Sequence, residues 1–341
     1  MQDKPFNFLK SQSSLFEIRK PAFCCIGIST GCILRCKMCS IWKNRYFTMP
    51  QEPALDEWYR FIDLIADLTE NSIEINVSGG EPLLDERNLS LVKFSAKKGL
   101  PTSMPTNGFL IDKEMACKIA DSGLSTIGIS LDGITRDTHD LLRGVKGCYD
   151  KAMQAIDYLD SCDSNIEIEI LATISEKNID EIIDLTKWAN EDNRIKTIIF
   201  QAIAQPFNTS FDNEWYNKSE YSFLWPQSAV KINTLLDELI KLKKMAYKIS
   251  NTKLQLETFK KYFNNPGEFI KKDKCNVDFY MNINQLGDVY MCPRKEPIGN
   301  IKKDTPREMW YSEKANLARK EIRNCKINCH HILNCCYEGE S

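Results

Sequence analysis

The stretch Gly31-Cys-Ile-Leu-Arg-Cys-Lys-Met-Cys39 brings Cys32, Cys36 and Cys39 together in one short run. Cysteine thiolates are the usual protein ligands of iron–sulfur clusters, and four of them complete a [4Fe–4S] cluster that only carries electrons. Three thiolates leave one iron without a protein ligand, so a substrate or cosubstrate can bind there. The stretch therefore predicts a cluster with one open iron, with Cys32, Cys36 and Cys39 as its ligands and as the catalytic centre.

These cysteines have two other possible roles. A Cys-x-x-Cys pair can form a zinc site or a redox dithiol, and free cysteines often pack as small apolar side chains. Structural zinc sites need four ligands, commonly as two separated pairs. No second cysteine pair or histidine lies nearby, because the only histidines are His139, His330 and His331. The iron–sulfur interpretation is therefore favoured.

Length and composition limit the class of protein. The chain has 341 residues, enough for one large domain and a smaller one. Its net charge of −2 predicts no general attraction to nucleic acid or to an acidic membrane. No apolar run approaches the ~18 residues that cross a bilayer, and the first residues lack the features of a secretory signal. We expect a cytoplasmic protein whose 14 cysteines serve metal or thiol chemistry rather than disulfides.

Short β-rich apolar runs alternate with helical patterns from Phe23 to about Ile203. This rhythm is typical of a parallel sheet with crossover helices. We expect helices such as 55–68 and 179–190, and six strands at 23–29, 72–78, 101–105, 126–131, 166–173 and 197–202. The predicted fold class is α/β, a partial (β/α)6 TIM-like barrel. Catalytic groups of such barrels follow the strands, and the three-cysteine run follows the first one.

The remaining segments divide the chain. We expect an N-terminal extension (1–22), the barrel (23–204), an aromatic-rich connector with an amphipathic helix at 228–249 (205–270), and a small cysteine-rich lobe (271–341). The aromatic part, 205–225, can pack over the barrel, cover a substrate, or do both. The lysine face of the amphipathic helix is expected to be solvated.

A second motif, Gly79-Gly80-Glu81-Pro82, follows the second expected strand. Two glycines let the backbone approach a ligand closely, and the Glu81 carboxylate with neighbouring carbonyls can accept hydrogen bonds from an ammonium group. By itself the tetrapeptide could equally be an ordinary turn at the end of a strand.

Together the two motifs resemble the signature of the radical S-adenosylmethionine (radical SAM) enzymes. The resemblance implies that SAM binds the open iron and that Gly79, Gly80, Glu81 and Pro82 bind its methionine amino group. Later strand ends resemble the wall of the same pocket, with the residues Asn107, Ser130 and Arg143. Ser130 would bond the ribose or carboxylate, and Arg143 would pair with the carboxylate. Arg143 could instead lie on the surface at a helix start. Asp132 and His139 are expected to hold the loop together.

The C-terminal cysteines resemble a SPASM or twitch domain, which carries auxiliary clusters. Gly287 is expected to turn a β-hairpin, so that Cys275 and Cys292 converge on one metal centre. The final group, Cys325, Cys329, Cys335 and Cys336, departs from the full family pattern, and too few cysteines remain for two complete four-thiolate sets. We therefore expect one auxiliary [4Fe–4S] cluster, held by Cys275, Cys292 and two cysteines of the final group. The adjacent Cys335 and Cys336 would point in different directions, so at most one of them, Cys335, is expected to be a ligand. Zinc bound with His330 or His331 is the alternative. The other cysteines are expected to pack in the core.

The resemblance also implies the chemistry. The reduced cluster would pass an electron, supplied by a flavodoxin- or ferredoxin-type donor, into SAM. The resulting 5′-deoxyadenosyl radical would remove hydrogen from an unactivated carbon that no side-chain base can deprotonate. We expect oxidation, epimerisation or bond formation on a small molecule such as a sugar or aminosugar, since the short segment before the first strand leaves no room for a leader-recognition domain. The alternatives are a maturase of a ribosomally made peptide and a non-catalytic iron–sulfur or zinc protein.

Overall fold

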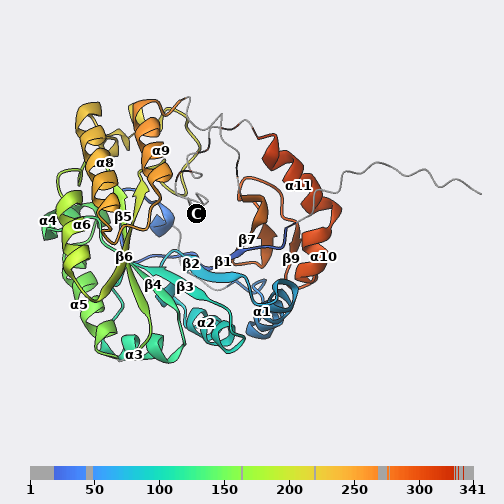
Figure 1. The fold of residues 1–341 in the computed structure, drawn as a ribbon. Helices are drawn as coiled ribbons and strands as arrows, with labels where there is room; N and C mark the ends of the chain where they lie inside the picture. The colour runs from blue at the N-terminus through green and yellow to red at the C-terminus, as the bar shows by residue number, and fades with distance from the viewer. Residues whose placement is uncertain are drawn as a thin grey trace, which may run out of the picture.

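The computed structural model describes residues 19–43, 49–162, 164–218, 220–267, 275, 277–325, 327, 329 and 333. One curved sheet runs through this part of the chain in the order β6-β5-β4-β3-β2-β1-β7-β8-β9 (Figure 1). Its first six strands are β1 (Phe23–Ser29), β2 (Glu74–Gly79), β3 (Thr102–Thr106), β4 (Thr126–Ser130), β5 (Glu167–Ile174) and β6 (Ile195–Ala202). Neighbours among these six pair in parallel. The predicted α/β fold with six parallel strands is confirmed, and every strand end lies within two residues of the expected position.

Helices cover the outer face of the sheet (Figure 1). They are α1 (Leu55–Thr69), α2 (Arg87–Lys97), α3 (Lys113–Asp121), α4 (Arg136–Arg143), α5 (Cys148–Asp160) and α6 (Ile182–Glu191). Alternate strand residues, such as Ile75 and Val77, are fully buried, because successive side chains of a strand point to opposite faces. The apolar half of each strand therefore packs against helices, and the other half faces the barrel interior.

The connector contains α7 (Trp215–Lys218), α8 (Ala229–Lys244) and α9 (Lys253–Asn264). The amphipathic helix that was expected to reach residue 249 ends at Lys244, so that expectation was wrong at its C-terminal end. Ala246 has a left-handed φ of 64°, which stops the helix. The chain then pairs with β6, where Ile198 N–H donates to the Lys248 carbonyl at 2.8 Å.

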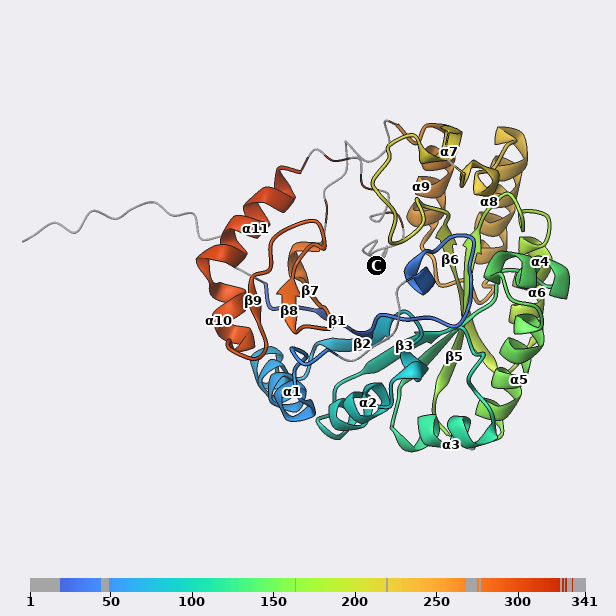
Figure 2. The ribbon, with the colours of Figure 1, turned by 180° about the vertical axis from the view of Figure 1, so that it is seen from behind.

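The C-terminal part continues the barrel sheet. Strand β7 (Tyr280–Ile283) pairs in parallel with β1, and β8 (Asp288–Tyr290) and β9 (Gly299–Asn300) follow in antiparallel order. Figure 2 shows these strands between β1 and the helices α10 (Pro306–Tyr311) and α11 (Glu313–Arg323). Gly287 turns the β7–β8 hairpin with a φ of 82°, as expected. The lobe and the barrel thus share one sheet.

Among the residues that the structure describes, no helix is both long and apolar enough to cross a membrane.

Candidate active site

The three-cysteine loop is fixed on two sides by backbone hydrogen bonds. On one side the carbonyl of Gly31 accepts from the N–H of Glu81 at 2.9 Å. On the other side, Arg35 N–H donates to the Arg143 carbonyl at 3.0 Å, and Lys37 N–H donates to the Leu142 carbonyl at 2.8 Å. The last carbonyls of a helix lack partners within it, so the C-terminal end of α4 anchors the loop directly around Cys36.

Gly144 makes this anchoring possible. It ends α4 with a left-handed φ of 71°, and a Cβ at this position would lie 2.1 Å from the Arg35 carbonyl oxygen. Only glycine has both the backbone freedom and the space that this contact requires.

The thiols of Cys32, Cys36 and Cys39 are partly buried and line one cavity of about 390 Å³. Burial, together with the nearby negative charges of Cys36, Glu81 and Cys39, raises the pKa of Cys32 to about 11. Burial also raises the pKa of Cys36 and Cys39. Three thiolates held together in this way need a cationic partner. The donor set therefore fits an iron–sulfur cluster, whose metal charge stabilises thiolates.

Arg143 lies inside this site and not on the surface. Its Nε lies 2.7 Å from Oδ2 of Asp132, which is fully buried. Although burial lowers it, the charges of Asp132 and Cys36 keep the pKa of Arg143 above its ordinary value. The same guanidinium lines the cavity. The surface alternative for Arg143 is therefore wrong, and its contact with a SAM carboxylate stays a prediction.

Asp132 and His139 hold the loop behind the site. Asp132 accepts a hydrogen bond from Thr173 N–H at 2.8 Å through Oδ1, and its own N–H donates to Nδ1 of His139 at 3.1 Å. Burial, together with the positive charge of Arg143, lowers the pKa of His139 to about 4. A neutral imidazole in the core supports the expected role in holding the loop.

The glycines after β2 meet the cysteine loop. A Cβ on Gly80 would lie 1.9 Å from the Gly31 carbonyl oxygen. The glycine pair was expected to allow close approach of a ligand. In the structure, Gly80 allows close approach of two backbone segments, which places the end of β2 against the start of the three-cysteine loop.

The Glu81 carboxylate ties two strand ends together. Its Oε1 accepts from Thr106 Oγ1 at 2.7 Å and from Leu83 N–H at 3.2 Å, and its Oε2 accepts from Asn107 N–H at 2.9 Å. Burial raises the pKa of Glu81, and these hydrogen bonds oppose the rise. Both carboxylate oxygens thus already accept hydrogen bonds from the protein. The predicted contact of Glu81 with an ammonium group stays a prediction.

All the predicted SAM-pocket residues except Pro82 line the same cavity as the three thiols. Asn107 also lies beside the cluster ligands, because its Nδ2 donates to Cys32 Sγ at 3.8 Å. Pro82 is buried at the start of the short helix η2 (Pro82–Leu84). It shapes the turn after Glu81 and does not line the cavity.

The segment after β6 contains a site residue that sequence reasoning did not single out. Phe207 lines the cavity, forms a parallel bridge with Cys39, and accepts a hydrogen bond from Ser40 N–H at 2.9 Å. In contrast, Trp215 and Trp225 are buried and pack edge to face with ring centroids 5.7 Å apart. Part of the aromatic segment therefore packs in the core, while Phe207 borders the cavity. The aromatic content of the segment was the available signal for a site residue, but it did not distinguish Phe207 from the tryptophans that pack in the core.

A second group of thiols gathers in the C-terminal lobe. Burial raises the pKa of Cys275, and the charges of Cys292, Cys329 and Cys325 raise it further. The pKa of Cys292 is raised in the same way by burial and by Cys329 and Cys325. The structure thus brings together four of the five predicted auxiliary ligands. Cys335, Cys336, His330 and His331 lie outside the described residues.

Neither thiol group of the described residues is arranged around a single metal ion. Among the described residues, no three histidine, cysteine, aspartate or glutamate side chains could together hold a metal ion. A structural zinc site places its ligands about 2.3 Å from one ion, whereas a cluster takes one thiolate at each iron corner.

The connector links the two thiol groups. Phe207 contacts the three-cysteine loop, and the ring of Phe211 lies 4.4 Å from the guanidinium carbon of Arg294. Arg294 follows shortly after Cys292 in the chain. One short segment therefore touches the surroundings of both candidate cluster sites.

A barrel with a three-thiolate cavity at its strand ends defines an enzyme that binds a cluster and a cosubstrate. Comparison with protein families agrees. Residues 26–189 match the radical SAM superfamily, and residues 275–335 match the SPASM iron–sulfur cluster-binding domain. The chain belongs to the radical SAM superfamily and carries a C-terminal SPASM domain. It is an enzyme of this superfamily, and its cofactors are a [4Fe–4S] cluster, SAM and an auxiliary iron–sulfur cluster.

Curated relatives have several activities. An Fe-coproporphyrin III synthase of Methanosarcina barkeri is 36% identical over 46% of this chain and 38% of its own length. An AdoMet-dependent heme synthase of the same organism is 24% identical over 86% of this chain and 82% of its own length. A PqqA peptide cyclase of Bradyrhizobium diazoefficiens is 24% identical over 53% and 46%. The match spans about half the length, or less, of several of these relatives.

Solved structures show the same fold. The structure of Streptococcus suis SuiB bound to S-adenosylmethionine superposes with a TM-score of 0.66 at 16% identity, over 88% of this chain and 68% of that one.

Proposed function

We propose that this enzyme removes a hydrogen atom from an unactivated carbon of a small molecule and completes a net oxidation with the help of its auxiliary cluster. The observation that carries the proposal is the pair of thiol groups bordered by one connector segment, through Phe207 and Phe211. When bound, the first cluster and SAM supply a 5′-deoxyadenosyl radical, and the second cluster supplies an electron acceptor. The residues around the cavity bind and orient the reactants.

Cys32, Cys36 and Cys39 would hold the first cluster with one iron open. The buried Arg143, fixed by Asp132, offers a permanent positive charge on the cavity wall that suits the SAM carboxylate. Asn107 and Ser130 add polar groups on the same wall. These residues orient the reacting atoms, which is the main contribution that a protein makes to such a reaction.

Cys275, Cys292, Cys325 and Cys329 would hold the auxiliary cluster. Cys325 and Cys329 lie near enough for their charges to raise the pKa of both Cys275 and Cys292, which supports this set. The set needs no thiolate from Cys335. Cys335 remains the alternative ligand within the proposal.

The substrate class rests on the comparison with curated relatives. The heme synthase relative spans most of this chain and of its own length, and its name describes a small-molecule product. We therefore favour a small molecule, of which a sugar or aminosugar is one kind. The second candidate is modification of a peptide, which is favoured by the match to a PqqA peptide cyclase. A flavodoxin- or ferredoxin-type protein is the proposed electron donor, with no nucleic acid or membrane partner.

The test is hydrogen transfer under anaerobic conditions. Reconstituted, reduced enzyme is incubated with SAM and deuterated candidates: a tetrapyrrole, amino sugars, and peptides encoded beside the gene. Deuterium that appears in 5′-deoxyadenosine identifies the substrate. Transfer only from a peptide would replace the small-molecule proposal by the second candidate. Failure of reduced, iron-loaded protein to form any 5′-deoxyadenosine would refute both.

A further inference from the structure

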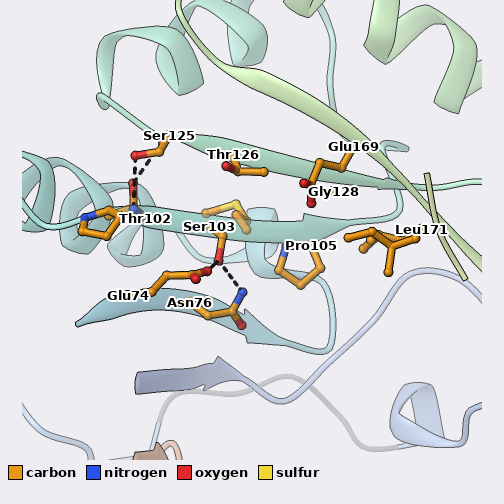
Figure 3. A pocket seen from close by; sticks show the side chains of 13 residues that line it. Glu74, Asn76, Thr102, Ser103, Pro105, Ser125, Thr126, Gly128, Glu169 and Leu171 are labelled. Carbon is orange, nitrogen blue, oxygen red and sulfur yellow. Dashed lines mark hydrogen bonds between the residues drawn. The ribbon is translucent and has the colours of Figure 1, made fainter. Parts of the chain in front are cut away.

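Next to the cavity that the three thiols line, which we call the SAM cavity, the barrel interior is hollow and lined by both polar and apolar side chains. Barrel interiors are normally filled by bulky branched side chains. Here a cavity of about 400 Å³ lies between strands β2 to β6 (Figure 3). Its lining includes Glu74, Asn76, Ser103, Thr126 and Glu169. We call this cavity the barrel chamber.

Side chains of β2 and β3 form an ordered chain along one wall of the barrel chamber. Asn76 Nδ2 donates to Ser103 Oγ at 2.8 Å, and Ser103 Oγ donates to the Glu74 carboxylate. Figure 3 shows these three side chains on one side of the space and Glu169 of β5 on another. The Glu74 carboxylate is therefore oriented by neighbours, and acceptors face the chamber from two walls.

The barrel chamber carries negative charge without a lining cation. Glu74 and Glu169 line it, and its lining contains no lysine, arginine or histidine. Burial raises the pKa of Glu169, and the charges of Glu167 and Glu74 raise it further, while Lys196 opposes them. A cationic occupant would relieve this repulsion. An ammonium or guanidinium group of the substrate can pair with these two carboxylates inside a cavity of this size.

The barrel chamber adjoins the SAM cavity. Pro105 and Leu171 line both spaces, so they form a waist between them. A Cβ on Gly128 would lie 2.6 Å from Leu171 Cδ1, so this glycine leaves the waist its room. At the opposite end, Ser125 and Thr126 line both the chamber and a cavity of about 630 Å³ that also includes Cys162 and Glu167. The three spaces thus follow one another along the barrel.

We propose that the barrel chamber binds an ammonium or guanidinium group of the substrate. Glu169 and Glu74 pair with this cation, and Asn76 and Ser103 hold Glu74 in place. The attacked carbon then lies on the other side of the Pro105–Leu171 waist, in the cavity with the three thiols. This inference rests on the proposed function and narrows its substrate class to molecules that carry a basic nitrogen on a short arm.

The experiment measures binding of n-butylammonium and of neutral n-butanol to the SAM-bound holoenzyme by saturation-transfer NMR. We expect butylammonium to bind at least about tenfold more tightly than butanol, because it adds a charge pair. Glu169→Gln should weaken butylammonium binding about tenfold and leave butanol binding unchanged. The matched control is Glu191→Gln, which removes the same charge from the exposed surface of α6 and should change neither affinity.

Equal binding of the two probes, or butylammonium binding that Glu169→Gln leaves intact, would overturn the inference. If millimolar Mg²⁺ by itself prevents butylammonium binding, the chamber is a metal site, and the inference is also overturned. SAM cleavage by the same wild-type preparation separates the two proposals. If 5′-deoxyadenosine forms but the probe does not bind, only the barrel chamber assignment fails.

Discussion

The anchoring of the cysteine loop on α4 predicts that Gly144→Ala removes the first cluster. In the structure, a Cβ at this position would lie 2.1 Å from the Arg35 carbonyl oxygen and 2.7 Å from its carbon. These are backbone atoms, so no side-chain rotation relieves the overlap. The loop must move away from the end of α4, and the hydrogen bonds of Arg35 and Lys37 on either side of Cys36 are lost.

Gly147 supplies a matched control a few residues away. Its φ of 85° is also left-handed, but a Cβ there would meet nothing within 4 Å. Gly147→Ala therefore costs only backbone strain, about 1–2 kcal/mol. Gly144→Ala adds overpacking of about 1–3 kcal/mol, for a total of roughly 2–5 kcal/mol. For domains of this size each kcal/mol lowers Tm by about 2–4 °C.

The assay compares iron content, Tm and SAM cleavage in anaerobically reconstituted protein. Gly144→Ala should have the lower Tm and should lose iron equivalent to the first cluster together with SAM cleavage. Gly147→Ala should keep the iron of the first cluster and SAM cleavage. Equal iron content and equal cleavage in the two variants would refute the proposed anchoring.

Three further predictions follow from the contacts. Cys292→Ala should lose the iron of the auxiliary cluster but still cleave SAM in the absence of substrate, as measured by iron analysis and by 5′-deoxyadenosine formation. Loss of SAM cleavage together with that iron would contradict the proposal that the two clusters occupy separate sites. Glu81→Gln should leave a buried donor of Leu83, Thr106 or Asn107 unpaired and destabilise the protein by about 1–3 kcal/mol, seen as a lower Tm; an unchanged Tm would contradict the tie between β2 and β3. His139 has its pKa lowered to about 4, so its contribution to stability is present above the unfolded pKa of about 6.5 and is lost as the pH falls. When the pH falls from 7.5 to 5.5, the free energy of unfolding of the wild type should decrease by about 1.4 kcal/mol more than that of His139→Asn. If Tm depends on pH in the same way in the two proteins, this prediction is refuted.

Much of the fold could be predicted because local patterns determine it. Each parallel strand alternates buried apolar residues with inward-facing ones, as in Ile168 and Glu169 of β5. Motifs at successive strand ends were therefore predicted to meet, and Cys32, Glu81, Asn107 and Arg143 do line one cavity.

Contacts between distant segments could not be predicted in this way. Strand β7 pairs with β1, although most of the chain separates them in sequence, and nothing in the local sequence of β7 indicates this pairing. The two glycines and Glu81 indicate a ligand site, whereas their contacts with Gly31 and Thr106 depend on how neighbouring strand ends stack. The aromatic segment likewise gave no sign that Phe207 would pair with Cys39 while Trp215 entered the core.

The central claim is that Cys32, Cys36 and Cys39 hold a cluster whose fourth iron binds SAM. The most direct test is electron paramagnetic resonance of the reduced Cys292→Ala protein, in which the auxiliary signal is removed. We expect a [4Fe–4S] signal that changes when SAM is added and that disappears when Cys32→Ala is introduced as well. A signal that is indifferent to SAM, or one that survives the loss of Cys32, would contradict it.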